Sequence, residues 1–165
     1  MIHKYLHLID KKMIILLIIM LIISPTLGGK NTYTICLIYS HYLTMYMNNV
    51  YLLMIYQYAS YINTMLPYII TRTSQDHFYT NSYLSLVMIN ILYQSSIYIS
   101  YYFFFGTIPK ESFTLTIVFM IMNMIIGCIE STIIYLQIGQ KKNFIYLAFP
   151  ILINVLFHMI FTQLF

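Results

Sequence analysis

Charged residues are few in this chain, and their spacing divides it into long neutral stretches. Eight lysines and arginines and four acidic residues make up 7% of the 165 residues, whereas soluble domains carry roughly 25%. A helix of about 20 apolar residues can cross a bilayer, and within hydrocarbon it pairs its own backbone polar groups. We therefore predict an all-α, multi-pass transmembrane protein of about five spans with no soluble domain. The neutral stretches are residues 13–29, 31–71, 77–109, 112–129 and 143–165.

Within the first stretch, lysines precede the apolar run 13–23 and Ser24 and Pro25 follow it, a pattern that is also typical of a secretory signal peptide. We expect an uncleaved first helix at 13–29 instead. Residues 1–80 then form an N-terminal membrane segment, and residues 81–165 a three-helix membrane bundle. The three helices are expected near 82–105, 113–138 and 144–165, with a polar turn at 106–112.

Residues 31–71 have room for either one or two crossings. One crossing places six basic residues on one side of the membrane and two on the other, whereas two crossings divide them four and four. The positive-inside rule favours the uneven division. It therefore predicts five spans with the N-terminus inside.

The composition favours isoleucine, tyrosine, methionine and phenylalanine, with 18 tyrosines and no tryptophan. These abundant types share A/T-rich codons, which indicates an AT-rich genome and, for so hydrophobic a chain, encoding in an organelle. Cys36 and Cys128 lie in apolar stretches and are expected to be small buried hydrophobes. We expect no cofactor, and no basic run with interleaved aromatic residues suggests nucleic-acid binding.

Glu130 is the most informative residue, because it lies well inside a predicted span. A carboxylate near mid-bilayer costs about 2.5–3.5 kcal/mol and should face the protein interior. Thr116, Asn123, Glu130 and Gln137 recur every seven residues, which is almost two helical turns, so they form one polar stripe. Gly127 lies near the same face and permits close approach of another helix. The stripe serves either to hold helices together or to relay protons through Glu130.

The last predicted span carries a similar pattern of Asn154, His158 and Thr162. His158 can exchange protons with Glu130 if the two helices pack together. The alternative is a hydrogen-bonded interior histidine. The sequence contains no phosphate loop, HExxH or GxSxG motif, so we do not expect an enzyme in this chain alone.

Residues 82–165 combine three closely spaced spans with Gly127-Cys128-Ile129-Glu130 in the middle one. This arrangement resembles the small membrane subunit four-L of NADH dehydrogenase (respiratory complex I), which has three helices and a Cys/Gly-x-Glu element in the middle one. The resemblance implies that Glu130 belongs to a chain of charged groups along the membrane arm. The family's third helix usually carries a second glutamate, whereas residues 144–165 contain His158 and no acid.

The expected function is that of a mitochondrial inner-membrane subunit in the proton-translocating arm of NADH:ubiquinone oxidoreductase. The candidate proton-relay residues are Glu130, Asn123, Gln137 and His158, and the expected partners are other hydrophobic subunits and membrane lipids. The alternative is a lineage-specific structural subunit of cytochrome oxidase or ATP synthase, in which Glu130 only anchors helices. A small secondary transporter is a third reading, disfavoured because no predicted span is broken at its middle by glycine or proline.

Overall fold

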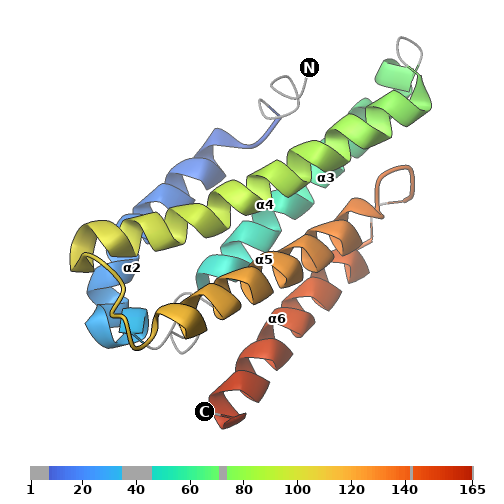
Figure 1. Cartoon of the computed structure of the whole chain (residues 1–165). Helices are drawn as coiled ribbons and strands as arrows, with labels where there is room; N and C mark the ends of the chain where they lie inside the picture. The colour runs from blue at the N-terminus through green and yellow to red at the C-terminus, as the bar shows by residue number, and fades with distance from the viewer. Residues whose placement is uncertain (1–7, 35–45, 71–73, 142, 165) are drawn as a thin grey trace.

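The computed structural model describes residues 8–34, 46–70, 74–141 and 143–164. Within these residues the chain is entirely helical, with no strand, which confirms the all-α prediction (Figure 1). The helices are α2 (Lys11–Thr34), α3 (Asn48–Ile70), α4 (Gln75–Phe105), α5 (Phe113–Tyr135) and α6 (Ile145–Leu164).

Local signals set the helix ends close to where the sequence predicts them. The side chain of Asp10 accepts a hydrogen bond of 2.9 Å from the Lys12 backbone N–H, the usual way to cap a first turn. Gly106, with φ of 78°, ends α4 and donates its N–H to the Tyr102 carbonyl. The turn at 106–112 is therefore confirmed. α4 begins at residue 75 rather than 82, where Asp76 in the first turn suits the helix dipole.

The helix expected at 13–29 is present and longer than predicted. α2 contains Pro25, and Gly29 departs from helical geometry with φ of 69° and ψ of 173°, a conformation almost restricted to glycine. α2 lies against α4, where the Ser100 hydroxyl donates to the Leu21 carbonyl.

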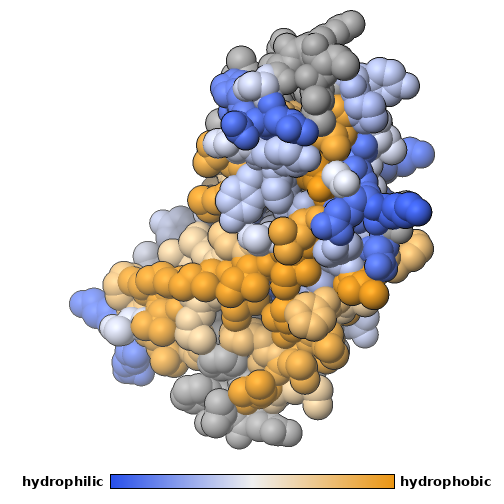
Figure 2. All heavy atoms as spheres, turned by 90° about the vertical axis from the view of Figure 1, so that its right-hand side faces the viewer, coloured by the Kyte–Doolittle hydropathy of each residue, from blue (hydrophilic) through white to orange (hydrophobic). Residues whose placement is uncertain are grey.

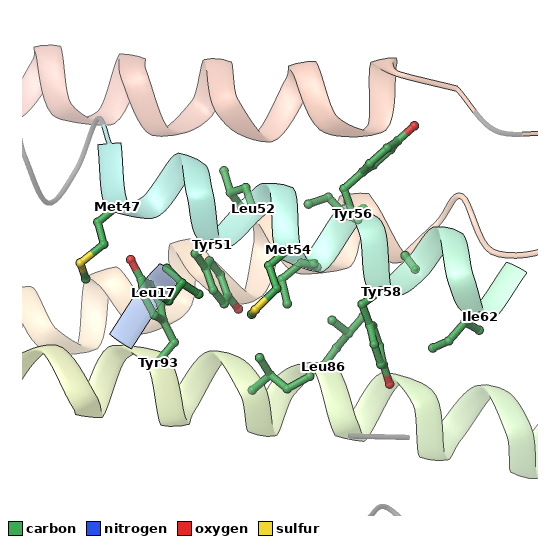
Figure 3. Close-up of a cluster of buried hydrophobic side chains, with 14 of the residues drawn as sticks. Leu17, Met47, Tyr51, Leu52, Met54, Tyr56, Tyr58, Ile62, Leu86 and Tyr93 are labelled. Atoms are coloured by element: carbon green, nitrogen blue, oxygen red, sulfur yellow. The ribbon is translucent and has the colours of Figure 1, made fainter. Parts of the chain in front are cut away.

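α3 is the central helix of the bundle and packs against all four others. Figure 3 shows its side chains on several faces, with α6 along one side and α4 along the other. The core cluster draws on helices from both sides of residue 80, including Leu17, Ile55 and Ile134. The division of the chain at residue 80 stays a prediction.

Two helical stretches are long and apolar enough to cross a membrane, Lys11–Lys30 and Phe113–Tyr135. α6 is apolar over Ile145–Ile160, whereas α3 and α4 are interrupted by Asn, Gln, Ser and Tyr. Figure 2 looks onto the end at which α3 meets α4 and α5 meets α6, where hydrophilic atoms gather beside wide apolar areas. These features indicate a membrane location, while the number of crossings stays a prediction.

Within residues 31–71, the structure describes one complete helix, α3. The segment 35–45 lies outside the described residues. Between the end of α2 and the start of α3 there are fewer residues than the roughly 20 that a spanning helix needs. The single crossing stays a prediction.

Candidate functional site

The polar stripe of α5 lies mainly on the buried side of the helix. Thr116, Glu130 and Gln137 are buried, and Asn123 is half-buried. The side chain of Glu130 is 3% exposed. A spacing of seven residues keeps Thr116, Asn123 and Glu130 on one face of α5, so its apolar faces are left to point outwards. α5 ends at Tyr135 rather than at residue 138, so Gln137 lies in the turn that follows the helix.

Glu130 is enclosed, and no ion pair reaches it from the part of the chain that the structure describes. Its Oε1 atom is buried and has no hydrogen-bond partner among the described residues. Tyr51 of α3 and Tyr93 of α4 lie close enough to interact with it electrostatically. Leaving a buried acceptor unsatisfied costs about 1–3 kcal/mol, and such groups call for a functional explanation or a bound water.

A network of uncharged groups joins three helices beside Glu130. The Tyr51 hydroxyl donates to Asn90 Oδ1 at 3.3 Å and lies 3.3 Å from the hydroxyl of Ser131, which follows Glu130 in α5. The Asn90 Nδ2 group donates to the Met124 carbonyl at 3.1 Å and to Cys128 Sγ at 3.3 Å. Residues from α3, α4 and α5 thereby fix each other's positions.

Gly127 makes this network sterically feasible. A Cβ atom added at this position would overlap the side-chain amide of Asn90. The close approach of α4 and α5 therefore depends on the absence of a side chain at Gly127, as expected where membrane helices pack through small residues.

Stacked tyrosine rings lead from this network to α6. Tyr51 and Tyr93 stack with ring centroids 4.1 Å apart and almost parallel planes (Figure 3). The Tyr93 hydroxyl donates to Asn48 Oδ1 at 2.7 Å. The amide of Asn48 donates in turn to Asn154 of α6 at 3.3 Å, and the amide of Asn154 to Asn49 at 3.2 Å. The polar network thus includes residues of four helices.

Gln137 belongs to another polar group, in the turn that follows α5. Its Nε2 atom donates to the Tyr56 carbonyl at 3.3 Å and to the Ser60 hydroxyl at 3.4 Å. Its Oε1 atom is buried and has no hydrogen-bond partner among the described residues. Gln137 therefore resembles Glu130 in presenting a buried oxygen without a protein donor.

His158 is buried on α6, one turn beyond Asn154. No hydrogen bond or ion pair joins it to Glu130 among the described residues, so proton exchange between the two stays a prediction. The side chain of Thr162 and the whole of Cys36 lie outside the described residues. Cys128 is a half-buried free thiol, and the described part of the chain contains no group of three residues that could hold a metal.

The sequence analysis did not find Tyr51, Asn90 and Tyr93. A signal was available on α4, where Ser82, Asn90, Tyr93 and Tyr101 recur at helical spacing and all lie on the buried face. Polar residues on a predicted interior face indicate interhelical hydrogen bonds. Such a pattern does not identify the partner on the other helix.

No family model, curated protein or solved structure matches this chain.

Proposed function

We propose that this chain is a multi-pass membrane subunit of a mitochondrial respiratory-chain complex, within the proton-translocating membrane arm of NADH:ubiquinone oxidoreductase. Its location is then the inner membrane, and its neighbours are other hydrophobic subunits and lipids. In this role Glu130 relays protons between hydrated groups. Electron transport to ubiquinone takes place on other subunits of the complex.

The observation that carries this proposal is the enclosure of Glu130 within α5, one of the two helical stretches long and apolar enough to cross a membrane. Ionisable residues within such helices are rare, face the interior and mark ion or proton pathways. Tyr51 and Ser131 place hydroxyl groups next to this position. The resemblance of residues 127–130 to subunit four-L suggests the particular complex.

Replacement of Glu130 by glutamine tests the relay. Glu130→Gln keeps the size of the side chain and one of its oxygens but cannot titrate. Loss of a positioned proton-transfer group typically costs about 10²-fold or more, so we expect proton pumping in sealed vesicles to fall by about that factor. The measurement is the rate of acidification that accompanies NADH oxidation by the assembled complex.

The matched control is Glu111→Gln, which removes an exposed carboxylate from the turn before α5. It should leave pumping unchanged. Native gels should show both variants assembled with the other NADH dehydrogenase subunits. Normal pumping by an assembled complex that carries Glu130→Gln would rule out the relay.

A structural role is the second candidate, as an accessory subunit of cytochrome oxidase or ATP synthase. It is favoured by the uncharged character of the polar network, in which amides and hydroxyls pair with each other and Glu130 has no ion pair among the described residues. Native-gel separation with mass spectrometry of each band discriminates the two. Co-migration with cytochrome oxidase or ATP synthase subunits favours the structural role.

A further inference from the structure

A groove lined by polar side chains runs along the outside of α3. Its volume is about 270 Å³, and every lining residue carries a hydroxyl or an amide; these residues are Tyr56, Gln57, Ser60, Tyr61 and Thr64. By contrast, the larger groove between α4 and α5 is lined mainly by isoleucine and methionine. Figure 3 shows Tyr56 pointing to the side of α3 away from Leu86, and therefore away from α4.

The groove connects to the polar stripe of α5 through one hydrogen bond. Ser60 lines the groove, and its hydroxyl lies 3.4 Å from Gln137 Nε2. Gln137 lies in the turn after α5, seven residues beyond Glu130. Each presents a buried Oε1 atom without a partner among the described residues. Buried water typically occupies such positions, where it donates to otherwise unsatisfied oxygens.

On the side of Glu130 where Asn90 lies, the polar groups are already hydrogen-bonded to each other. There the amide of Asn90 is fully used by Tyr51, Met124 and Cys128, and it fills the space over Gly127 so closely that a Cβ atom would overlap it. Tyr51 and Tyr93 stack across the same level. Among the described residues, the Asn90 amide therefore already has its partners, whereas the Oε1 atoms of Glu130 and Gln137 have none.

We propose that the α3 groove is an aqueous entry that leads to Glu130 from one side of the membrane, the side on which α5 passes into α6. Water enters between Tyr56 and Thr64, and Ser60 and Gln137 position it on the way to Glu130. A proton then passes from this water to the Glu130 carboxylate. The inference rests on the proposed function, because it assigns the route by which that relay is supplied.

Thiol labelling tests the hydration and the sidedness of the groove. In a full-length chain carrying Cys36→Ser and Cys128→Ser, a single cysteine is introduced as Ser60→Cys and treated in sealed vesicles with a charged, membrane-impermeant methanethiosulfonate. Only the thiolate reacts, and it forms in water. We expect Ser60→Cys to react about tenfold or more faster than the control, and from one side only.

The matched control is Leu136→Cys. Leu136 immediately precedes Gln137, whose amide contacts Ser60, so it lies at nearly the same depth as Ser60. Its side chain is 55% exposed on the apolar surface. If lipid covers this surface, the control reacts slowly although it is the more exposed position. Equal rates at the two positions, or equal rates from both sides of the membrane, would overturn the proposed entry.

Pumping before and after labelling of the same vesicles tests the connection to Glu130. An adduct on Ser60→Cys should reduce pumping several-fold, whereas treatment of Leu136→Cys should leave it unchanged. A labelled Ser60→Cys with undiminished pumping would refute the route to Glu130, even if Glu130→Gln abolishes pumping. If instead Glu130→Gln pumps normally, the relay fails, and the labelling rates still report separately on whether the groove is hydrated.

Discussion

At the residue scale, the contact between Asn90 and Gly127 sets how closely α4 and α5 approach. A methyl group at position 127 would overlap the Asn90 amide, which is held by hydrogen bonds to Tyr51, Met124 and Cys128. We expect Gly127→Ala to destabilise the fold by about 1–3 kcal/mol, as overpacking of a filled interior does. Equilibrium unfolding of the full chain in lipid bicelles measures this change.

A double-mutant cycle shows whether the cost arises at this contact. Asn90→Ala removes the obstructing amide, so adding Gly127→Ala to it should cost much less than Gly127→Ala alone. Residues in contact typically show coupling of about 0.5–3 kcal/mol. Additive effects of the two substitutions would contradict the contact.

The Tyr51 hydroxyl is the second position at which one atom can be tested. Tyr51→Phe keeps the ring that stacks on Tyr93 but leaves Asn90 Oδ1 and the Ser131 hydroxyl without this partner. We expect a loss of about 1 kcal/mol of unfolding free energy, measured in the same bicelles. Tyr102→Phe, at an exposed position of α4, should be neutral; an equal loss there would show that the effect is not specific to the network.

The sequence predicted relations between residues of the same helix, but it did not predict which residues pair between different helices. Thr116 and Glu130 could be placed on one helical face from their spacing alone, because helix geometry relates residues of the same helix. Gln137 is also buried but lies in the turn after α5, so the spacing does not explain its position. Asn123 has the same spacing but is only half-buried. Its burial could not be predicted, because periodicity does not reveal where the contact with a neighbouring helix ends. Tyr51 and Asn90 were missed because their importance lies in pairing across α3, α4 and α5.

At the element scale, the helix ends were the more predictable feature, because local residues decide them. Gly106 ends α4 with φ of 78° and ψ of −150°, and no atom lies within 4 Å of the place that a Cβ would occupy. The cost of Gly106→Ala is therefore purely conformational, about 1–3 kcal/mol. Thermal unfolding of the purified chain checks this expectation, with the exposed neighbour Thr107→Ala as control. A neutral Gly106→Ala would mean that α4 ends in another way.

At the scale of the whole molecule, the outward apolar faces separate a membrane protein from a soluble bundle. Ile125 lies near the middle of α5 and is 54% exposed. In a bilayer Ile125→Lys places a charge at the helix centre, which costs about 3 kcal/mol, whereas an exposed substitution in water changes stability by only about 0.5 kcal/mol. We therefore expect Ile125→Lys to lower the fraction of chain that resists alkaline extraction from membranes.

Ile145→Lys is the matched control for this experiment. Ile145 is also exposed but lies in the first turn of α6, where a lysine side chain can extend to the membrane interface. It should remain resistant to extraction. If both variants insert as well as the unaltered chain, the outward face of α5 does not meet lipid.

The central place of α3 has a consequence for biogenesis. α3 and α4 are too polar to qualify as spans by themselves, and Asn48 and Tyr51 find partners on α5 and α6, which are synthesised later. A nascent chain that ends after α4 keeps the bonds of Tyr51 to Asn90 and of Tyr93 to Asn48, but the amide N–H groups of Asn48 and Asn90 lack their partners on α6 and α5. We infer that α3 is retained at the insertion machinery until α5 and α6 emerge, so that truncated chains become substrates for membrane quality control.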